Sequence, residues 1–172
     1  ACLKQVYTSM EQLLADSKPP TSVSLAAYKP KRIIDLVIEA SDEDWDPMYH
    51  ELRKQTDLFA PEEQVEPRDL IRKNPWKFSY RFEDENGKVR KLMIEDWEIG
   101  ALYWNCLGRA NGNEQEALRL VRQKYEEEFL TKCDVTLFLG TTLAFHAKNA
   151  PNPFVIIGVF YPRKRDQLKL SF

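Results

Sequence analysis

Cysteine is scarce in this 172-residue chain, which has three of them: Cys2, Cys106 and Cys133. An odd number at wide spacing fits neither a disulfide framework nor a zinc-binding knuckle. Free cysteines usually behave as small buried hydrophobic side chains. We expect this of Cys106, which lies among the apolar residues of a helical segment.

Long hydrophobic runs and an excess of one charge are also missing. No apolar stretch approaches the ~18 residues of a membrane-spanning helix, and no charged-then-apolar leader opens the chain. The 25 Lys and Arg residues oppose 27 Asp and Glu, for a formal net charge of −2. This balance argues against a polycation that coats nucleic acid. We therefore expect a soluble cytoplasmic protein with reduced cysteines and no membrane partner, and the oligomeric state stays open.

Hydrophobic residues make up 43 % of the chain, enough for a core that needs neither metal nor disulfide. Apolar spacing predicts helices at 3–16, 42–56, 95–107 and 113–129, and strands at 32–40, 76–83, 89–94, 134–140 and 154–161. This order predicts an α+β fold: a single domain with one mixed sheet of about five strands and helices packed on it. We expect an N-terminal helix and extended arm at 1–30, the α+β domain at 31–162 and a tail at 163–172.

Two strand patterns are specific enough to predict positions in the sheet. Residues 32–40 are almost continuously apolar, which is typical of a central strand covered on both faces. In residues 76–83, aromatic and polar side chains alternate, so the aromatic ones should face the core. Asn86 and Gly87 then predict a two-residue type I′ turn, in which Tyr80 would lie opposite Met93.

Four carboxylates form the first candidate site: Asp35 within the apolar strand, and Glu95, Asp96 and Glu98 where a helix begins. Converging carboxylates could hold Mg²⁺ or Mn²⁺ for a metal-dependent nuclease. The usual nuclease spacing, an acidic residue, one intervening residue and a lysine on a strand, is not cleanly present. The alternative is that the last three stabilise the positive end of the helix. Asp35 is the most informative of the four, because a carboxylate in a buried strand needs a partner.

Basic residues interleaved with aromatic ones form the second candidate site. Arg72, Lys73, Lys77 and Arg81 could neutralise phosphates if this side of the strand is open, while aromatic rings stack on bases. The alternative is that these charges are solvated and the rings belong to the core.

The last six residues, 167–172, are Gln-Leu-Lys-Leu-Ser-Phe. They resemble the hexapeptide by which bacterial polymerases and repair factors bind the β sliding clamp. The resemblance implies that the Gln167 side chain hydrogen-bonds at the rim of the clamp pocket. It also implies that Leu168, Leu170 and Phe172 fill adjoining hydrophobic pockets.

The hypothesis that follows is a non-enzymatic accessory protein of DNA replication or repair, tethered to a sliding clamp and in contact with nucleic acid or another protein. It needs no cofactor. The nuclease is one alternative, with Mg²⁺ or Mn²⁺ as its metal. The other is a plain protein-interaction domain in which the alternating residues of the tail form an ordered edge strand. The sequence assigns no role to the loop around His146.

Overall fold

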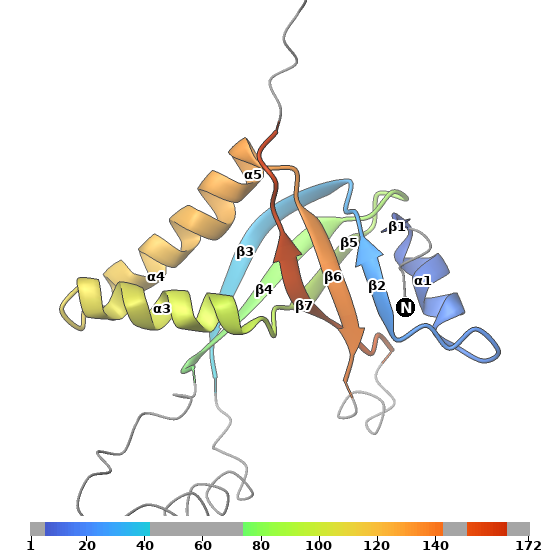
Figure 1. Ribbon diagram of the computed structural model, residues 1–172, viewed down its shortest axis with the longest axis horizontal. Helices are drawn as coiled ribbons and strands as arrows, with labels where there is room; N and C mark the ends of the chain where they lie inside the picture. Colours follow the sequence, from blue (N-terminus) through green and yellow to red (C-terminus); the bar gives the residue numbers. More distant parts are fainter. Residues whose placement is uncertain (1–5, 42–73, 143–150, 165–172) are drawn as a thin grey trace, which may run out of the picture. The chain divides into compact units, whose positions relative to one another are not determined.

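A computed structural model describes residues 6–41, 74–142 and 151–164 (Figure 1). The chain divides into a larger unit, residues 1–38 with 78–172, and a smaller unit, residues 39–77. In the smaller unit the structure describes the two strand ends, where the Ser41 amide donates a hydrogen bond to the Pro75 carbonyl (2.8 Å). The larger unit is a single α+β domain, as the sequence predicts.

The strands of the described residues are β1 (Val6–Tyr7), β2 (Leu25–Tyr28), β3 (Arg32–Ala40), β4 (Trp76–Glu83), β5 (Val89–Met93), β6 (Thr136–Thr141) and β7 (Phe154–Phe160). The helical segments are α1 (Met10–Asp16), α3 (Trp97–Arg109), α4 (Glu114–Arg122), the π-helical turn η2 (Gln123–Glu128) and α5 (Phe129–Lys132).

The strands form two sheets where the sequence predicts one. Sheet A has the order β1-β2-β6-β7 and sheet B the order β3-β4-β5. The sheets meet where Ile94, just after β5, bridges Ile156 of β7, and the Glu95 amide donates to the Ile156 carbonyl (2.8 Å). In Figure 1, β6 and β7 lie in front of β3 and β4, and α3 and α4 form a hairpin beside β7.

Aromatic side chains fill the space between these layers. The ring of Tyr28 on β2 packs against Phe82 on β4, with centroids 5.4 Å apart. The Tyr80 hydroxyl, also on β4, donates to the Tyr125 carbonyl of η2 (2.6 Å) and ties the helices to sheet B. Burial raises the pKa of Tyr80, so its hydroxyl keeps its proton and remains a donor.

The N-terminal segment contains a helix, as predicted, and this helix contributes side chains to the core. Helix α1 begins after Ser9, whose side chain accepts from the Gln12 amide, and it buries Met10 and Leu13 completely. The stretch expected as an extended connector contains β2, which pairs with both β1 and β6. Its sequence, Leu-Ala-Ala-Tyr, gives little strand signal because alanine is a weak strand former.

Strand β3 has the predicted bounds, but it lies at an end of sheet B and not at its centre. Helical side chains complete its backbone hydrogen bonding: the Leu36 amide donates to Glu126 Oε2 (3.1 Å), and Arg122 Nη1 donates to the Leu36 carbonyl (2.9 Å). Arg122 also pairs with Glu126 (2.8 Å). The two side chains thus replace a neighbouring strand at this residue, which protects an apolar edge from unwanted pairing.

The hairpin of β4 and β5 confirms the predicted alternation, since Phe78, Tyr80 and Phe82 are at most 2 % exposed. Its turn differs. A type I′ turn needs positive φ at two consecutive residues, and in this loop only Gly87 has it (φ +78°). The Gly87 amide donates to the Asp84 carbonyl (3.0 Å), which closes a turn within a longer loop. As a result Tyr80 lies opposite Leu92, one residue from the predicted Met93.

Candidate interaction surface

The carboxylate predicted inside the apolar strand has the partner that its position requires. Asp35 accepts two hydrogen bonds from Arg81 on β4, at 3.0 Å from Nε and 2.5 Å from Nη2. Both side chains are partly exposed. Asp35, a candidate metal ligand, and Arg81, a candidate phosphate contact, therefore neutralise each other across two strands of sheet B.

The other three candidate carboxylates lie at the start of α3. Asp96 is its N-cap residue, and its side chain accepts from the Glu98 amide (3.0 Å). The alternative interpretation is thus confirmed for Asp96, while Glu95 and Glu98 are exposed beside it. Within residues 6–41, 74–142 and 151–164, no three His, Cys, Asp or Glu side chains gather as a metal site would require.

Most of the other predicted site residues lie outside the described residues. These are Arg72 and Lys73 of the basic candidate, His146 of the loop, and the whole clamp-like peptide with Gln167, Leu168, Leu170 and Phe172. Lys77 lies half-buried on β4. Cys106 and Cys133 are free and buried, as expected for Cys106, and burial raises the pKa of the Cys106 thiol.

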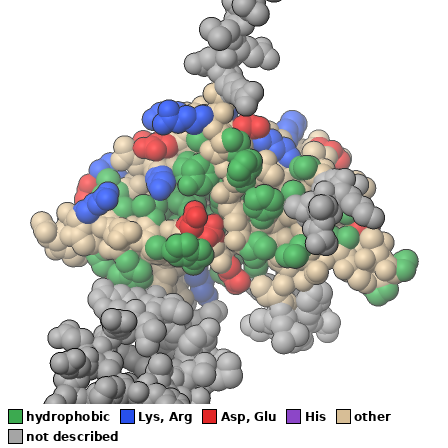
Figure 2. Space-filling model, in the orientation of Figure 1, with side chains coloured by type: hydrophobic (Ala, Val, Ile, Leu, Met, Phe, Trp, Pro, Cys, Tyr) green, Lys and Arg blue, Asp and Glu red, His purple; other side chains and the backbone are tan. Residues whose placement is uncertain are grey.

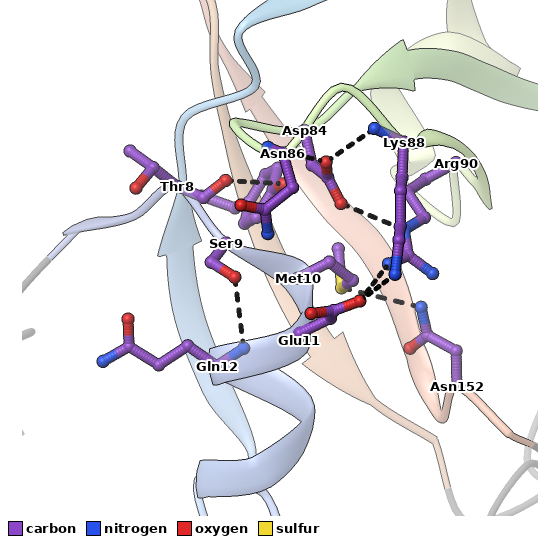
Figure 3. Close-up of polar contacts among 11 residues, drawn as sticks. Thr8, Ser9, Met10, Glu11, Gln12, Asp84, Asn86, Lys88, Arg90 and Asn152 are labelled. Atoms are coloured by element: carbon purple, nitrogen blue, oxygen red, sulfur yellow. Dashed lines mark hydrogen bonds and ion pairs between the residues drawn. The ribbon is translucent and has the colours of Figure 1, made fainter.

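A buried carboxylate that the sequence analysis missed organises the β4–β5 loop (Figure 3). Asp84 has no solvent exposure, and its side chain accepts from the amides of Asn86 (3.0 Å) and Lys88 (2.9 Å) and from Arg90 Nε (3.2 Å). Burial disfavours the charged form, but the bonds from Lys88, Arg90 and Asn86 outweigh it and hold the pKa of Asp84 below its ordinary value. Glu11 of α1 pairs with Lys88 and Arg90, which connects the loop to the helix. Because Asp84 is buried and accepts three hydrogen bonds from its own loop and strand, it has a structural role.

The outer side of sheet A carries a group of exposed apolar side chains. On β6, Leu137 and Leu139 are fully buried, so Phe138 and Gly140 between and beside them face outward. Leu25 of β2 lies opposite Gly140 in the ladder. The exposed members of this apolar face are Val6 (56 % exposed), Leu25 (61 %), Ile157 (43 %) and Phe160 (53 %).

These side chains form one continuous surface. A Cβ on Gly140 would lie 3.1 Å from Ile157 and 3.5 Å from Leu25, so both side chains extend over the glycine and meet there. The rings of Phe138 and Phe160 are 6.3 Å apart on β6 and β7. In Figure 2, hydrophobic side chains gather over β6 and β7, and charged side chains of both signs border them.

Sequence reasoning missed this face for a physical reason. A continuous apolar run is typical of a strand covered on both faces, so it does not indicate an open face. The run that forms β7 indicated only a buried strand. The available signals were Gly140 and Gly158, since a strand glycine often marks close approach of other groups. The Gly158 position lies 3.6 Å from the Phe138 ring.

Comparison with known protein families matches residues 6–171 to the family described as "Domain of unknown function (DUF8757)". The chain belongs to the DUF8757 family. No curated protein and no solved structure matches it. The function of this DUF8757 domain therefore has to be inferred from its own surface.

The described helices can also be compared with the requirements of a membrane-spanning helix. In the part of the DUF8757 chain that the structure describes, no helix combines the length and apolar character needed to cross a bilayer.

Proposed function

We propose that this chain is a non-enzymatic protein-interaction module and that the apolar face of sheet A is its docking surface. The observation that carries the proposal is that exposed Leu25 of β2 and Ile157 of β7 meet over Gly140 of β6, the strand between them. Scattered apolar side chains are ordinary on protein surfaces, but contiguous apolar patches bordered by polar groups are typical of interaction sites. Of the candidate site residues that the structure describes, Asp35 and Arg81 pair with each other and Asp96 caps α3, which favours binding over catalysis.

A crosslinking experiment tests the docking surface. A photoreactive phenylalanine analogue in place of Phe160 should form covalent products with a bound protein when irradiated in cells. Adding Leu25→Asp should remove most of these products, because a carboxylate placed in an apolar contact must be desolvated without a partner.

Val89 provides the matched control for this experiment. It is 58 % exposed, close to the 53 % of Phe160, but it lies on β5 of sheet B. The same analogue at Val89 should give few products. Equal crosslinking from both positions, or none from Phe160, would contradict the proposal.

A second candidate function rests on the sequence of the last six residues. Their resemblance to the bacterial β-clamp peptide supports tethering to a sliding clamp, with Gln167 as the polar contact and Leu168, Leu170 and Phe172 as the apolar ones. Such a tether is compatible with a separate docking surface on the domain, since the two would engage different partners or different sites.

Deletion of residues 167–172 tests the tether. Binding to a purified bacterial β clamp, measured by surface plasmon resonance, should be lost while the circular dichroism spectrum and melting temperature stay unchanged. Substituting Gln167 and Leu168 with alanine should weaken binding about ten-fold or more, since such anchors carry much of the energy of an interface. A full-length chain that does not bind the clamp, or a deletion that binds equally well, would remove this candidate.

A further inference from the structure

We infer that the apolar face docks a second copy of this chain, sheet A against sheet A with the strands of the two copies reversed. This inference rests on the proposed function and names the partner. In a twofold dimer the same patch meets itself, so the patch must be complementary to its own rotated copy. The apolar face meets this condition in two ways. Its hydrophobic centre would pack against the same hydrophobic centre of the other copy, and its two ends carry opposite charges.

The acidic end lies beside the first half of β7. The Glu95 amide donates to the Ile156 carbonyl, which fixes the start of α3 next to this strand. Glu95 and Glu98 are exposed there. Trp97, between them in the sequence, is 78 % exposed.

The basic end lies beyond the last residue of β7. Arg163 bridges Cys133, and Lys164 Nζ donates to the carbonyls of Leu130 and Thr131 (3.1 Å each). Exposed Lys132 adds a third positive charge at this end.

Other charged side chains near the basic end affect its net charge. Lys29 and Asp134 pair with each other and add no net charge. Glu127 and Glu128 come one turn earlier in the helix and oppose the cations in part. Lys164 is therefore the best basic position to test, because two carbonyls hold it at the end of the strand.

Rotation by half a turn about an axis across the strands places the acidic end of one copy on the basic end of the other, twice in the same dimer. Packed sheets keep their strand directions aligned to within about 30°, which this arrangement allows. The formal net charge of −2 adds little repulsion between copies.

The size of the face indicates a weak dimer. Strands ~4.8 Å apart and up to ~20 Å long give sheet A a footprint of at most roughly 400 Å², because β1 has only two residues and β2 four. This is no more than about half of the ~800 Å² that each partner contributes to a standard interface, so we expect a dimer that forms only at high concentration.

Sedimentation velocity of the full chain over low micromolar to submillimolar concentrations, at low salt, tests the dimer. The wild type should pass from monomer to dimer. Leu25→Asp should raise the dissociation constant about ten-fold or more, because it buries an unpaired charge. Val89→Asp should change it less than about two-fold, since that side chain lies outside the face.

Charge exchange tests the orientation. Glu98→Lys and Lys164→Glu should each weaken the dimer about three-fold or more, and the double variant should recover most of the loss. A monomeric wild type at every concentration would overturn the inference, as would equal effects of Leu25→Asp and Val89→Asp. A double variant weaker than both single variants would overturn the reversed arrangement.

The two proposals fail in distinguishable ways. If Phe160 crosslinks to a different protein and sedimentation shows only monomer, the docking surface stands and the second copy is excluded. If Phe160 yields no crosslinked product and the chain is monomeric, both proposals are excluded.

Discussion

Replacing Leu13 with alanine is expected to lower the free energy of unfolding by about 2–5 kcal/mol, the range for large-to-small substitutions in a core. Leu13 is fully buried on α1. If the N-terminal helix and extended arm expected at 1–30 did not pack on the domain, the same substitution would cost almost nothing. Chemical denaturation of the full chain, followed by circular dichroism, measures the difference.

Leu14 is the control for this substitution. It lies next to Leu13 on the same helix, but it is only partly buried. Leu14→Ala changes helix propensity in the same way. It should lower the free energy of unfolding by well under half as much, because the Leu14 side chain buries less apolar surface. Equal effects of the two variants would show that α1 does not pack against the domain as described.

Local signals predicted the elements whose stability is decided within a few residues. The aromatic alternation of β4 gave the buried side chains correctly, because side-chain direction in a strand repeats every two residues. The helix predicted at 113–129 begins as expected, because the Asn113 side chain accepts from the Glu116 amide (3.2 Å) and caps it. Asp96 is likewise a helix cap that a local signal, the acidic residues at the start of the predicted helix, indicated.

The errors concern contacts made by residues far apart in the sequence. The position of β3 at an edge depends on Arg122 and Glu126, about 90 residues later in the chain. The place of β2 inside sheet A depends on β6, more than 100 residues away. No local pattern records such a partner, so an edge strand looked central and a paired strand looked like a connector.

The candidate site also depends on contacts between residues that are far apart in the sequence. The sequence shows that β7 is apolar, but not that the outer side of sheet A lacks a covering helix among the described residues. Asp35 was assigned to a metal site as a carboxylate and Arg81 to a phosphate-binding site as a cation. In the structure these two residues, 46 positions apart, form one ion pair. The apolar face could be found only after the strands had been placed next to one another.

Asp84→Ala is expected to lower the free energy of unfolding by about 2–4 kcal/mol at neutral pH. The substitution removes three hydrogen bonds to a buried carboxylate and leaves Arg90 without this partner. Chemical denaturation measures the loss. Glu85→Gln in the same loop is the control: Glu85 is exposed, and its change should stay within about 0.5 kcal/mol. A loss no larger than that of the control would show that Asp84 does not hold the loop together.

The acid dependence of a second variant, Asp84→Asn, separates the charge of this carboxylate from its shape. The pKa of Asp84 in the folded chain is below its ordinary value of 3.8 because the hydrogen bonds of Lys88, Arg90 and Asn86 outweigh its burial. Ionised Asp84 therefore stabilises the fold above about pH 4, and the contribution is lost as the pH falls below 3.8 through the lower folded pKa. Glu83 and Glu116, whose pKa values are also lowered, titrate equally in both proteins and cancel in the comparison. The stability difference between wild type and Asp84→Asn should accordingly narrow in acid, whereas a difference independent of pH would show that the charge contributes nothing.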